Sequence, residues 1–287
     1  MGLGGYILWT PVAREYYRAF GKKVYFTNRV FGRLPFPRRV DRSPLFVNNP
    51  FVSTGAGEEA DELRLDNREA NYWTRVTRDR IDYKPGAHAV EIACAAYGVH
   101  APEIRCELFL TEPELETGRS VRADLGPYVA VEPHTKDSFT VNKQWGFERW
   151  QDVADRLRAE GVRLLQVGEA GKPLLEGVED ATGRFGIRET GAVLHHASLL
   201  LTPEGGLMHL ANAVGTRAVV VYGGYVSPDL TGYPENINLY APVDCAPCGL
   251  RRACLHDRRV CMDAITVNRV VESALRLMKE GDSSRTA

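Results

Sequence analysis

The fold is decided by the stretch Leu199-Leu-Leu-Thr-Pro-Glu-Gly-Gly-Leu-Met-His-Leu-Ala-Asn-Ala-Val-Gly-Thr-Arg-Ala-Val-Val-Val-Tyr-Gly223. Its first apolar run, Leu199 to Thr202, predicts a buried strand, and its second, Arg217 to Tyr222, predicts another. Between them two glycines turn the chain into an expected helix from Leu207 to Val214. A strand, a helix and a strand joined by short turns form the repeating unit of a parallel sheet.

The same alternation runs through the rest of the second half. Further strands are expected at Tyr128–Val131 and Val162–Val167, and further helices at Phe147–Glu160, Ile187–Ala197 and Val267–Lys279. Strands that alternate with helices in this way predict an α/β protein with a doubly wound parallel sheet. We assign residues 127–280 to this domain and expect a disordered tail at 281–287.

The first part of the chain, residues 1–126, reads as a less regular α/β domain that ends near Gly126-Pro127. It opens with a glycine-rich turn. The elements expected after it are helices at Pro11–Phe20, His88–Tyr97 and Leu115–Asp124 and short strands at Lys23–Thr27, Leu45–Val47 and Glu62–Leu65. These elements are shorter and more irregular than those of the second half.

The composition indicates an ordinary globular protein. The 287 residues are 44% hydrophobic and 25% charged, with a formal net charge of -1. Because a nucleic-acid binder normally carries a basic face, this balance argues against nucleic acid as a partner. No apolar run approaches the roughly 20 residues that span a bilayer. The stretch from Met1 to Pro11 lacks the basic and apolar regions of a signal peptide. We therefore expect a cytoplasmic protein and leave open a peripheral attachment to the inner membrane.

Four of the six cysteines gather near the C-terminus, in the knuckle 245–261: Cys245, Cys248, Cys254 and Cys261. Four thiolates at such short spacings can surround one tetrahedral ion. Disulfides and free thiols are the alternatives, and a reducing compartment favours the metal over disulfides. All-sulfur ligation suits zinc or iron, and the sequence does not separate the two.

The strongest candidate site follows the strand at Leu199–Thr202. In a parallel α/β sheet, ligands bind beyond the carboxyl ends of the strands. Here Gly205 and Gly206 allow a ligand to approach the backbone, and the helix that follows offers free N–H groups to a phosphate. Glu204 is placed to accept hydrogen bonds from sugar hydroxyls, and His209 to donate one to a phosphate oxygen. The alternative is that Glu204 caps the helix and His209 is a core residue.

Other polar side chains fall at neighbouring strand ends or in the opening turn. Thr135, Lys136 and Lys143 follow the strand at Tyr128–Val131, and lysine suits phosphate as a point charge. A solvated basic loop is the competing interpretation. Glu169 follows the next strand, where a carboxylate can accept from a ribose diol or simply occupy a surface turn. The glycine turn, with Gly4 and Gly5, is a weaker phosphate-loop candidate.

A family resemblance rests on three of these segments and on the cysteines. Glu204-Gly-Gly-Leu-Met-His-Leu-Ala-Asn-Ala-Val-Gly215 resembles the donor-site signature of glycosyltransferase family 9, the bacterial heptosyltransferases. Lys143-Gln-Trp-Gly-Phe-Glu-Arg-Trp150 is similar to that family's Lys-x-Trp-Pro-x-x-x-Trp segment, and Gly2 to Val12 resembles its opening loop. A Cys-x2-Cys pair with two later cysteines occurs in members that include autotransporter heptosyltransferases, where it is associated with iron.

The resemblance implies a GT-B fold, in which two Rossmann-like domains with parallel sheets face a cleft, here with a reduced N-terminal, acceptor-side domain. The C-terminal domain would hold a nucleotide-diphosphate sugar. By resemblance, Thr135 and Lys143 contact the donor phosphates and Glu169 the ribose. The sugar and diphosphate would be held by Glu204, Gly205, Gly206 and His209.

The implied chemistry is inverting transfer of a sugar, with ADP-heptose as the leading donor. The acceptor would be a saccharide, a lipid-linked saccharide or a protein, which connects the family with lipopolysaccharide biosynthesis. No catalytic metal is expected, so an ion at the cysteines would be structural. A homo-oligomer is a further expectation.

Three departures from the family pattern keep other functions open. The family usually has Asp, the expected catalytic base, where this chain has Gly5, so the catalytic residue is unknown. Glu15, Asp41 and Asp66 are possible replacements without a spacing argument. The signature usually reads Asp-Ser/Thr-Gly rather than Glu204-Gly-Gly, and the N-terminal part matches poorly. The alternatives are a catalytically degenerate family member that binds nucleotide or sugar for a partner, and another GT-B enzyme such as a nucleotide-sugar epimerase or a hydrolase.

Overall fold

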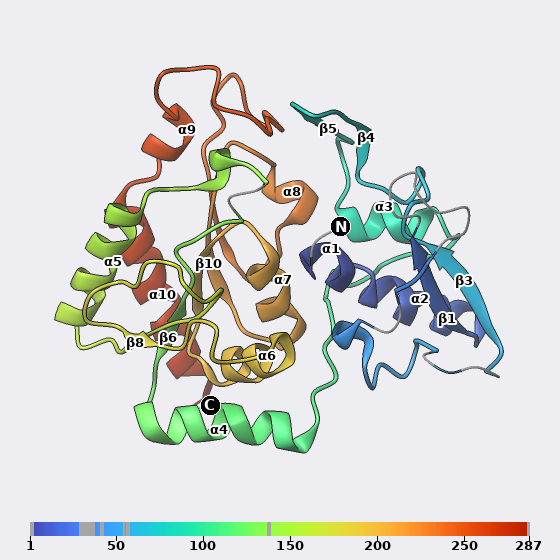
Figure 1. Ribbon diagram of the computed structural model, residues 1–287, viewed down its shortest axis with the longest axis horizontal. Helices are drawn as coiled ribbons and strands as arrows, with labels where there is room; N and C mark the ends of the chain where they lie inside the picture. Colours follow the sequence, from blue (N-terminus) through green and yellow to red (C-terminus); the bar gives the residue numbers. More distant parts are fainter. Residues whose placement is uncertain are drawn as a thin grey trace.

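A computed structural model describes residues 3–28, 38–40, 43–53, 55, 58–136 and 139–285. The chain forms two lobes that lie side by side, each built from helices and strands (Figure 1). The larger lobe is the C-terminal one and contains the sheet that the sequence predicts. The architecture is therefore α/β, as expected.

The sheet of the C-terminal lobe has six strands, and every pairing in it is parallel. The strand order is β11-β10-β9-β6-β7-β8. The strands are β6 (Val129–Val131), β7 (Leu164–Gln166), β8 (Glu179–Asp180), β9 (Leu200–Pro203), β10 (Ala218–Gly223) and β11 (Ile237–Tyr240). The sequence predicted β6, β7, β9 and β10 to within a few residues and missed the two edge strands.

Helices cover both faces of this sheet because successive side chains along each strand point to opposite faces, and both faces are apolar. Val129 and Val131 pack with Trp150 and Leu157 on one face, whereas Ala130 belongs to the core on the other. The first face is covered by α5 (Phe147–Ala159) and α10 (Val267–Arg285), and the second by α6 (Ile187–His196) and α7 (Gly206–Ala213). Short helices α8 (Pro228–Thr231) and α9 (Val260–Asp263) and the 3-10 turn η2 (Val141–Lys143) lie in the connections.

The N-terminal lobe has a much smaller sheet, in which β1 pairs in parallel with β3 and antiparallel with β2. An antiparallel hairpin, β4–β5, stands apart from it. The elements are α1 (Leu3–Ile7), α2 (Thr10–Phe20), α3 (Ala89–Ala95), β1 (Lys23–Asn28), β2 (Arg38–Arg39), β3 (Ala60–Arg64), β4 (Trp73–Val76) and β5 (Ile81–Tyr83). The lobe is therefore a reduced version of a Rossmann-like domain.

The helix α4 (Glu112–Leu125) packs on the C-terminal lobe rather than on the N-terminal one. A Cβ on Gly118 would overlap the backbone of Ala192, so α4 and α6 are in close contact. Arg188 of α6 bonds to Glu114 with its Nε 2.6 Å from the carboxylate, and this bond lowers the pKa of Glu114 to about 2. Helix α4 therefore packs as part of the C-terminal lobe, although it precedes the boundary expected at 126.

Two local expectations are wrong. The segment at Leu45–Val47 is not a strand, because Pro44 and the Ser43 side chain start a 3-10 turn, η1 (Pro44–Phe46), instead. Helix α10 extends to Arg285, past its expected end at Lys279. The disordered tail expected at 281–287 stays a prediction, and residues 286–287 lie outside the described residues.

Candidate functional site

The candidate site lies at the point where the strand order of the large sheet reverses. After β6 the chain adds β7 and β8 on one side, and after β9 it adds β10 and β11 on the other. The neighbouring strands β6 and β9 therefore flank a topological switch point, which is where open α/β sheets bind ligands. The loops that follow these two strands carry most of the side chains singled out in the sequence.

The loop after β9 places Glu204 directly at the strand end and starts α7 at Gly206. Glu204 is buried although it is charged. Its carboxylate forms an ion pair with Lys143 Nζ, which comes from η2 in the loop after β6. The two predicted donor-site groups thus meet across the switch point, and in this structure they neutralise each other.

Aromatic rings surround this ion pair. Lys143 Nζ lies 4.9 Å from the ring centre of Tyr225 and 5.1 Å from that of Phe139. Tyr83 of the N-terminal hairpin meets Tyr225 edge to face at 6.2 Å and stacks on Tyr72 at 6.2 Å. The Tyr225 hydroxyl is buried beside Tyr83. The hairpin therefore brings the N-terminal lobe into the candidate site, which the sequence did not indicate.

The opening segment also reaches the site. It was expected to be a glycine-rich turn, but from Leu3 to Ile7 it is the helix α1. A Cβ built on Gly4 would lie 2.7 Å from Cδ2 of His209 and 3.1 Å from the Cα of Gly206. Only glycine allows α1 to approach α7 this closely. The sequence predicted Gly205, Gly206 and His209 as one site and Gly4 as a separate candidate, and the structure places Gly4 against Gly206 and His209.

His209 is buried and bonded through its ring. Its Nδ1 lies 2.6 Å from the hydroxyl of Tyr233, which stands after α8. Burial lowers the pKa of His209 to about 3, so the imidazole is neutral at physiological pH. The core interpretation of His209 and a functional one are therefore both compatible with its position at the start of α7.

The remaining polar candidates lie at the ends of β6 and β7. The Thr135 hydroxyl is buried and finds no hydrogen-bond partner among the residues that the structure describes, whereas Lys136 is exposed. Glu169 is exposed and acts electrostatically on Glu132, a half-buried carboxylate at the end of β6. Burial, and then the charge of Glu169, raise the pKa of Glu132 to about 8. The strand-end rule that singled out Glu169 applies equally to Glu132, which the sequence analysis passed over.

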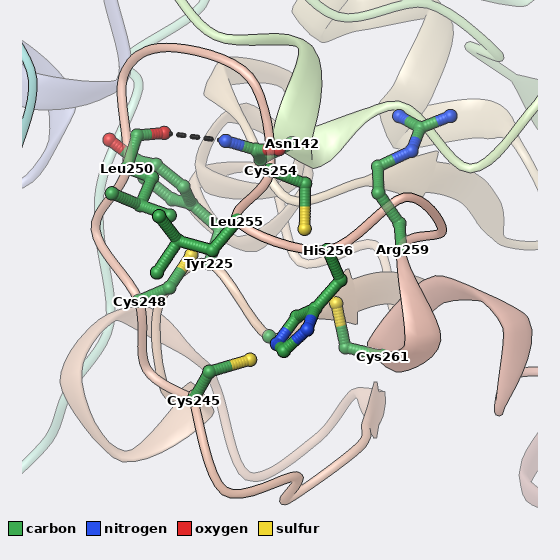
Figure 2. Close-up of a pocket in the computed structure, with 11 residues that line it drawn as sticks. Asn142, Tyr225, Cys245, Cys248, Leu250, Cys254, Leu255, His256, Arg259 and Cys261 are labelled. Carbon is green, nitrogen blue, oxygen red and sulfur yellow. Dashed lines mark hydrogen bonds between the residues drawn. The ribbon is translucent and has the colours of Figure 1, made fainter.

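The cysteine knuckle forms a second candidate site next to the first. All four of its thiols are free and line one pocket, into which His256 also projects (Figure 2). Among the residues described here, however, no three His, Cys, Asp or Glu side chains are placed to hold one ion. The donor set suits zinc or iron, but holding one ion requires the side chains to turn further toward one another.

The knuckle is joined to both lobes. The backbone N–H of Ile81 donates to the Gly249 carbonyl at 2.9 Å, and the N–H of Arg251 donates to the Asp79 carbonyl at 2.7 Å. On the other side, the Asn142 side chain donates to the Leu250 carbonyl at 2.8 Å. The knuckle therefore connects the β4–β5 hairpin with η2, the turn that carries Lys143.

Two of the three carboxylates considered as the catalytic base, Glu15 and Asp66, belong to the described residues. Glu15 is buried and accepts from Arg14 Nε at 2.7 Å and from Arg18 at 2.9 Å. Asp66 pairs with Arg64 at 3.1 Å. Asp41 lies outside the described residues. Both described carboxylates are thus already engaged by arginines.

A comparison with protein-family models decides the classification. The model of glycosyltransferase family 9 (heptosyltransferase) matches residues 63–257. The chain belongs to glycosyltransferase family 9. It is thus a glycosyltransferase, as the resemblance of the glycine turn and the Lys143 segment implied. No curated protein sequence matches the chain.

Solved structures with the same fold come from this family. A glycosyl transferase family 9 protein from Veillonella parvula is 15% identical, covers 98% of this chain and 95% of its own, and superposes with a TM-score of 0.69. The iron-containing dodecameric glycosyltransferase TibC from enterotoxigenic E. coli is 18% identical and superposes with a TM-score of 0.71. The match covers 98% of this chain and 74% of TibC. The E. coli ADP-heptose LPS heptosyltransferase II is 14% identical and superposes with a TM-score of 0.65. The match covers 98% of this chain and 97% of the heptosyltransferase. These likenesses establish the GT-B fold.

Among the described residues, no helix combines the length and the apolar character needed to cross a bilayer.

Proposed function

We propose that this glycosyltransferase transfers a heptose from ADP-heptose to an acceptor hydroxyl with inversion at the anomeric carbon. The donor is supported by family membership and by the ligands of two structural relatives. TibC has been solved with ADP-D-β-D-heptose, and the E. coli heptosyltransferase WaaC with ADP-2-deoxy-2-fluoro heptose.

The observation that carries this proposal is the convergence of Lys143, Glu204 and the Gly206 turn at the switch point, with Gly4 of the other lobe against it. The N-terminus of α7 presents free N–H groups there, and these favour a diphosphate. In inverting transfer without a metal, negative charge grows on the departing diphosphate. Lys143 and the α7 amides would stabilise that charge.

Donor binding requires a change in the ion pair. Lys143 and Glu204 satisfy each other in this structure, so a diphosphate must compete with Glu204 for the ammonium group. Glu204, once released, is placed to accept from sugar hydroxyls. The buried Thr135 hydroxyl would donate to a phosphate oxygen, and Glu169 would accept from the ribose. The base that removes the acceptor proton is unassigned, because Gly5 stands where the family has Asp.

Several properties of the whole protein remain part of the proposal. The acceptor is a saccharide, a lipid-linked saccharide or a protein, and we place the enzyme in the cytoplasm or at the inner-membrane surface. A homo-oligomer is suggested by the dodecameric TibC. The acceptor-side role of the N-terminal lobe is an assignment by resemblance.

We also propose that the knuckle holds one structural zinc or iron ion through Cys245, Cys248, Cys254 and Cys261. The shared pocket, the free state of the thiols and the iron in TibC support this. Elemental analysis of the purified protein by mass spectrometry identifies the metal. Cys248→Ser should lose the ion, whereas Cys94→Ala, at a buried cysteine elsewhere, should keep it.

Incubation with a panel of nucleotide sugars, with and without candidate acceptors, tests the function. The proposal predicts ADP release from ADP-heptose that depends on an acceptor. Release without acceptor would indicate a hydrolase, and a changed sugar on an intact nucleotide would indicate an epimerase.

A catalytically degenerate, nucleotide-binding member is the second candidate. Gly5 in place of the usual Asp and the closed Lys143–Glu204 pair favour it. This candidate predicts that ADP-heptose binds but is not turned over with any acceptor.

A further inference from the structure

A buried chain of hydrogen bonds links His209 to the core. The hydroxyl of Tyr233 lies 2.6 Å from His209 Nδ1 and 3.1 Å from the Cys106 sulfur. Tyr233 is 1% exposed, His209 4% and Cys106 0%, so water does not compete for these contacts. The backbone N–H of Cys106 also donates to the Asn212 side chain at 2.8 Å, which fixes the Cys106 segment on the same helix as His209.

The chemistry of the three groups sets the direction of donation. A phenol is a stronger donor than a thiol, and a neutral imidazole nitrogen is a better acceptor than sulfur. The favourable order is therefore the Cys106 S–H donating to the Tyr233 oxygen and the Tyr233 O–H donating to His209 Nδ1. The reverse order would leave the phenol donating to a weak sulfur acceptor.

The second ring nitrogen of His209 faces the other lobe. A Cβ on Gly4 would lie 3.5 Å from Nε2 and 2.7 Å from Cδ2, so this edge of the imidazole lies against α1. A neutral imidazole carries one proton, and a hydrogen bond accepted at Nδ1 leaves that proton on Nε2.

We propose that Tyr233 is a positioning residue that holds His209 in the Nε2-protonated tautomer, so that Nε2–H donates to the donor diphosphate beside Gly4. The contact with the diphosphate rests on the proposed function. The tautomer itself does not, because it follows from contacts within the protein alone.

Nitrogen-15 NMR of the histidine rings at pH 7 measures the tautomer directly. The signal of His209 is assigned by its disappearance in His209→Gln. The wild type should carry its proton on Nε2, and Tyr233→Phe should shift His209 toward a mixture of tautomers. A wild-type proton on Nδ1, or an unchanged tautomer in Tyr233→Phe, overturns the inference. If Tyr233→Phe does not fold, the wild-type spectrum, assigned with His209→Gln, still decides the tautomer.

Tyr222→Phe is the matched control. Tyr222 is buried as well, but its hydroxyl contacts Met208 and Thr231, each at 3.4 Å, instead of His209. Loss of the Tyr222 hydroxyl should leave the His209 tautomer unchanged. A shift as large as that in Tyr233→Phe would mean that core packing sets the tautomer, and would overturn the role of Tyr233.

Calorimetric titration with ADP separates this inference from the proposed function. Loss of one hydrogen bond should weaken ADP binding about tenfold in Tyr233→Phe and in His209→Gln. A changed tautomer with unchanged ADP affinity in both variants supports the role of Tyr233 and removes His209 from the donor site.

Discussion

Lys143 and Glu204 form an ion pair that closes the switch point between β6 and β9. Their side chains are only 15% and 6% exposed. Because an isolated charge is costly in such surroundings, each group depends on the other until a ligand replaces it. The pair is therefore both a structural element and the place where a donor diphosphate must bind.

Lys143→Ala should destabilise the fold and weaken nucleotide binding together. It leaves the Glu204 carboxylate buried without a partner, and removal of one member of a buried pair costs about 3 kcal/mol. Urea unfolding measures the stability, and ADP titration the affinity. Lys136→Ala, at an exposed lysine of the same loop, should change stability by less than about 0.5 kcal/mol. Equal stability of the two variants would mean that Glu204 is satisfied by other groups.

Gly4→Ala should separate α1 from α7. The added methyl group would sit 2.7 Å from the His209 ring and 3.1 Å from the Gly206 backbone, so one of them must move. Overpacking of this kind costs roughly 1–3 kcal/mol. The affinity for ADP should also fall, because the turn at Gly206 is displaced. Gly55→Ala is the control, because its added Cβ would meet no atom within 4 Å among the described residues outside its own chain neighbours. If Gly4→Ala keeps the stability and the ADP affinity of the wild type, the lobes do not meet at this point.

Gly249→Ala should loosen the contact between the knuckle and the β4–β5 hairpin. Gly249 has φ 59°, and a Cβ there would collide with the Ile81 carbonyl. Amide hydrogen exchange over 73–83 should become faster as the hairpin detaches. Gly171→Ala carries the same backbone penalty at φ 77° without any neighbouring atom, so it should leave that exchange unchanged. Equal exchange in both variants would argue against the connection.

The depressed pKa of His209 predicts a pH-dependent stability. The unfolded histidine binds a proton below its ordinary value of 6.5, whereas the buried ring, which faces His88 and Lys143, does so only near pH 3. Unfolding is thus favoured as the pH falls through this window. Between pH 7 and pH 5 the wild type should lose about 2 kcal/mol of unfolding free energy relative to His209→Gln. His100→Gln, at an exposed histidine, is the control for the loss of a histidine as such. If the unfolding free energies of wild type and His209→Gln differ by the same amount at pH 7 and pH 5, His209 is not buried in its neutral state.

The second half of the fold could be predicted because its strands are continuous apolar runs bounded by glycine turns. Val219 to Val221, for example, are buried on both sides and read as a parallel strand. The edge strand β8 could not be predicted, because Glu179 and Asp180 are exposed and carry no apolar pattern. The hairpin β4–β5 was missed for a different reason, because its backbone bonds to the knuckle, which is distant in sequence.

The candidate site was predicted in part. Strand-end logic found Lys143 and Glu204, but their direct pairing depends on which strands are neighbours, and sequence order does not give this. Tyr233 and Tyr225 carry no local signal, because their roles come from contacts with distant segments. Glu132 had the same signal as Glu169 and was overlooked.

A structure of the protein with ADP bound tests the central claim most directly. We predict that the diphosphate lies at the N-terminus of α7, within hydrogen-bond distance of the Gly206 amide and of Lys143 Nζ, with the Lys143–Glu204 pair broken. ADP bound elsewhere, or a Lys143–Glu204 pair that stays intact at saturating ADP, would contradict the account.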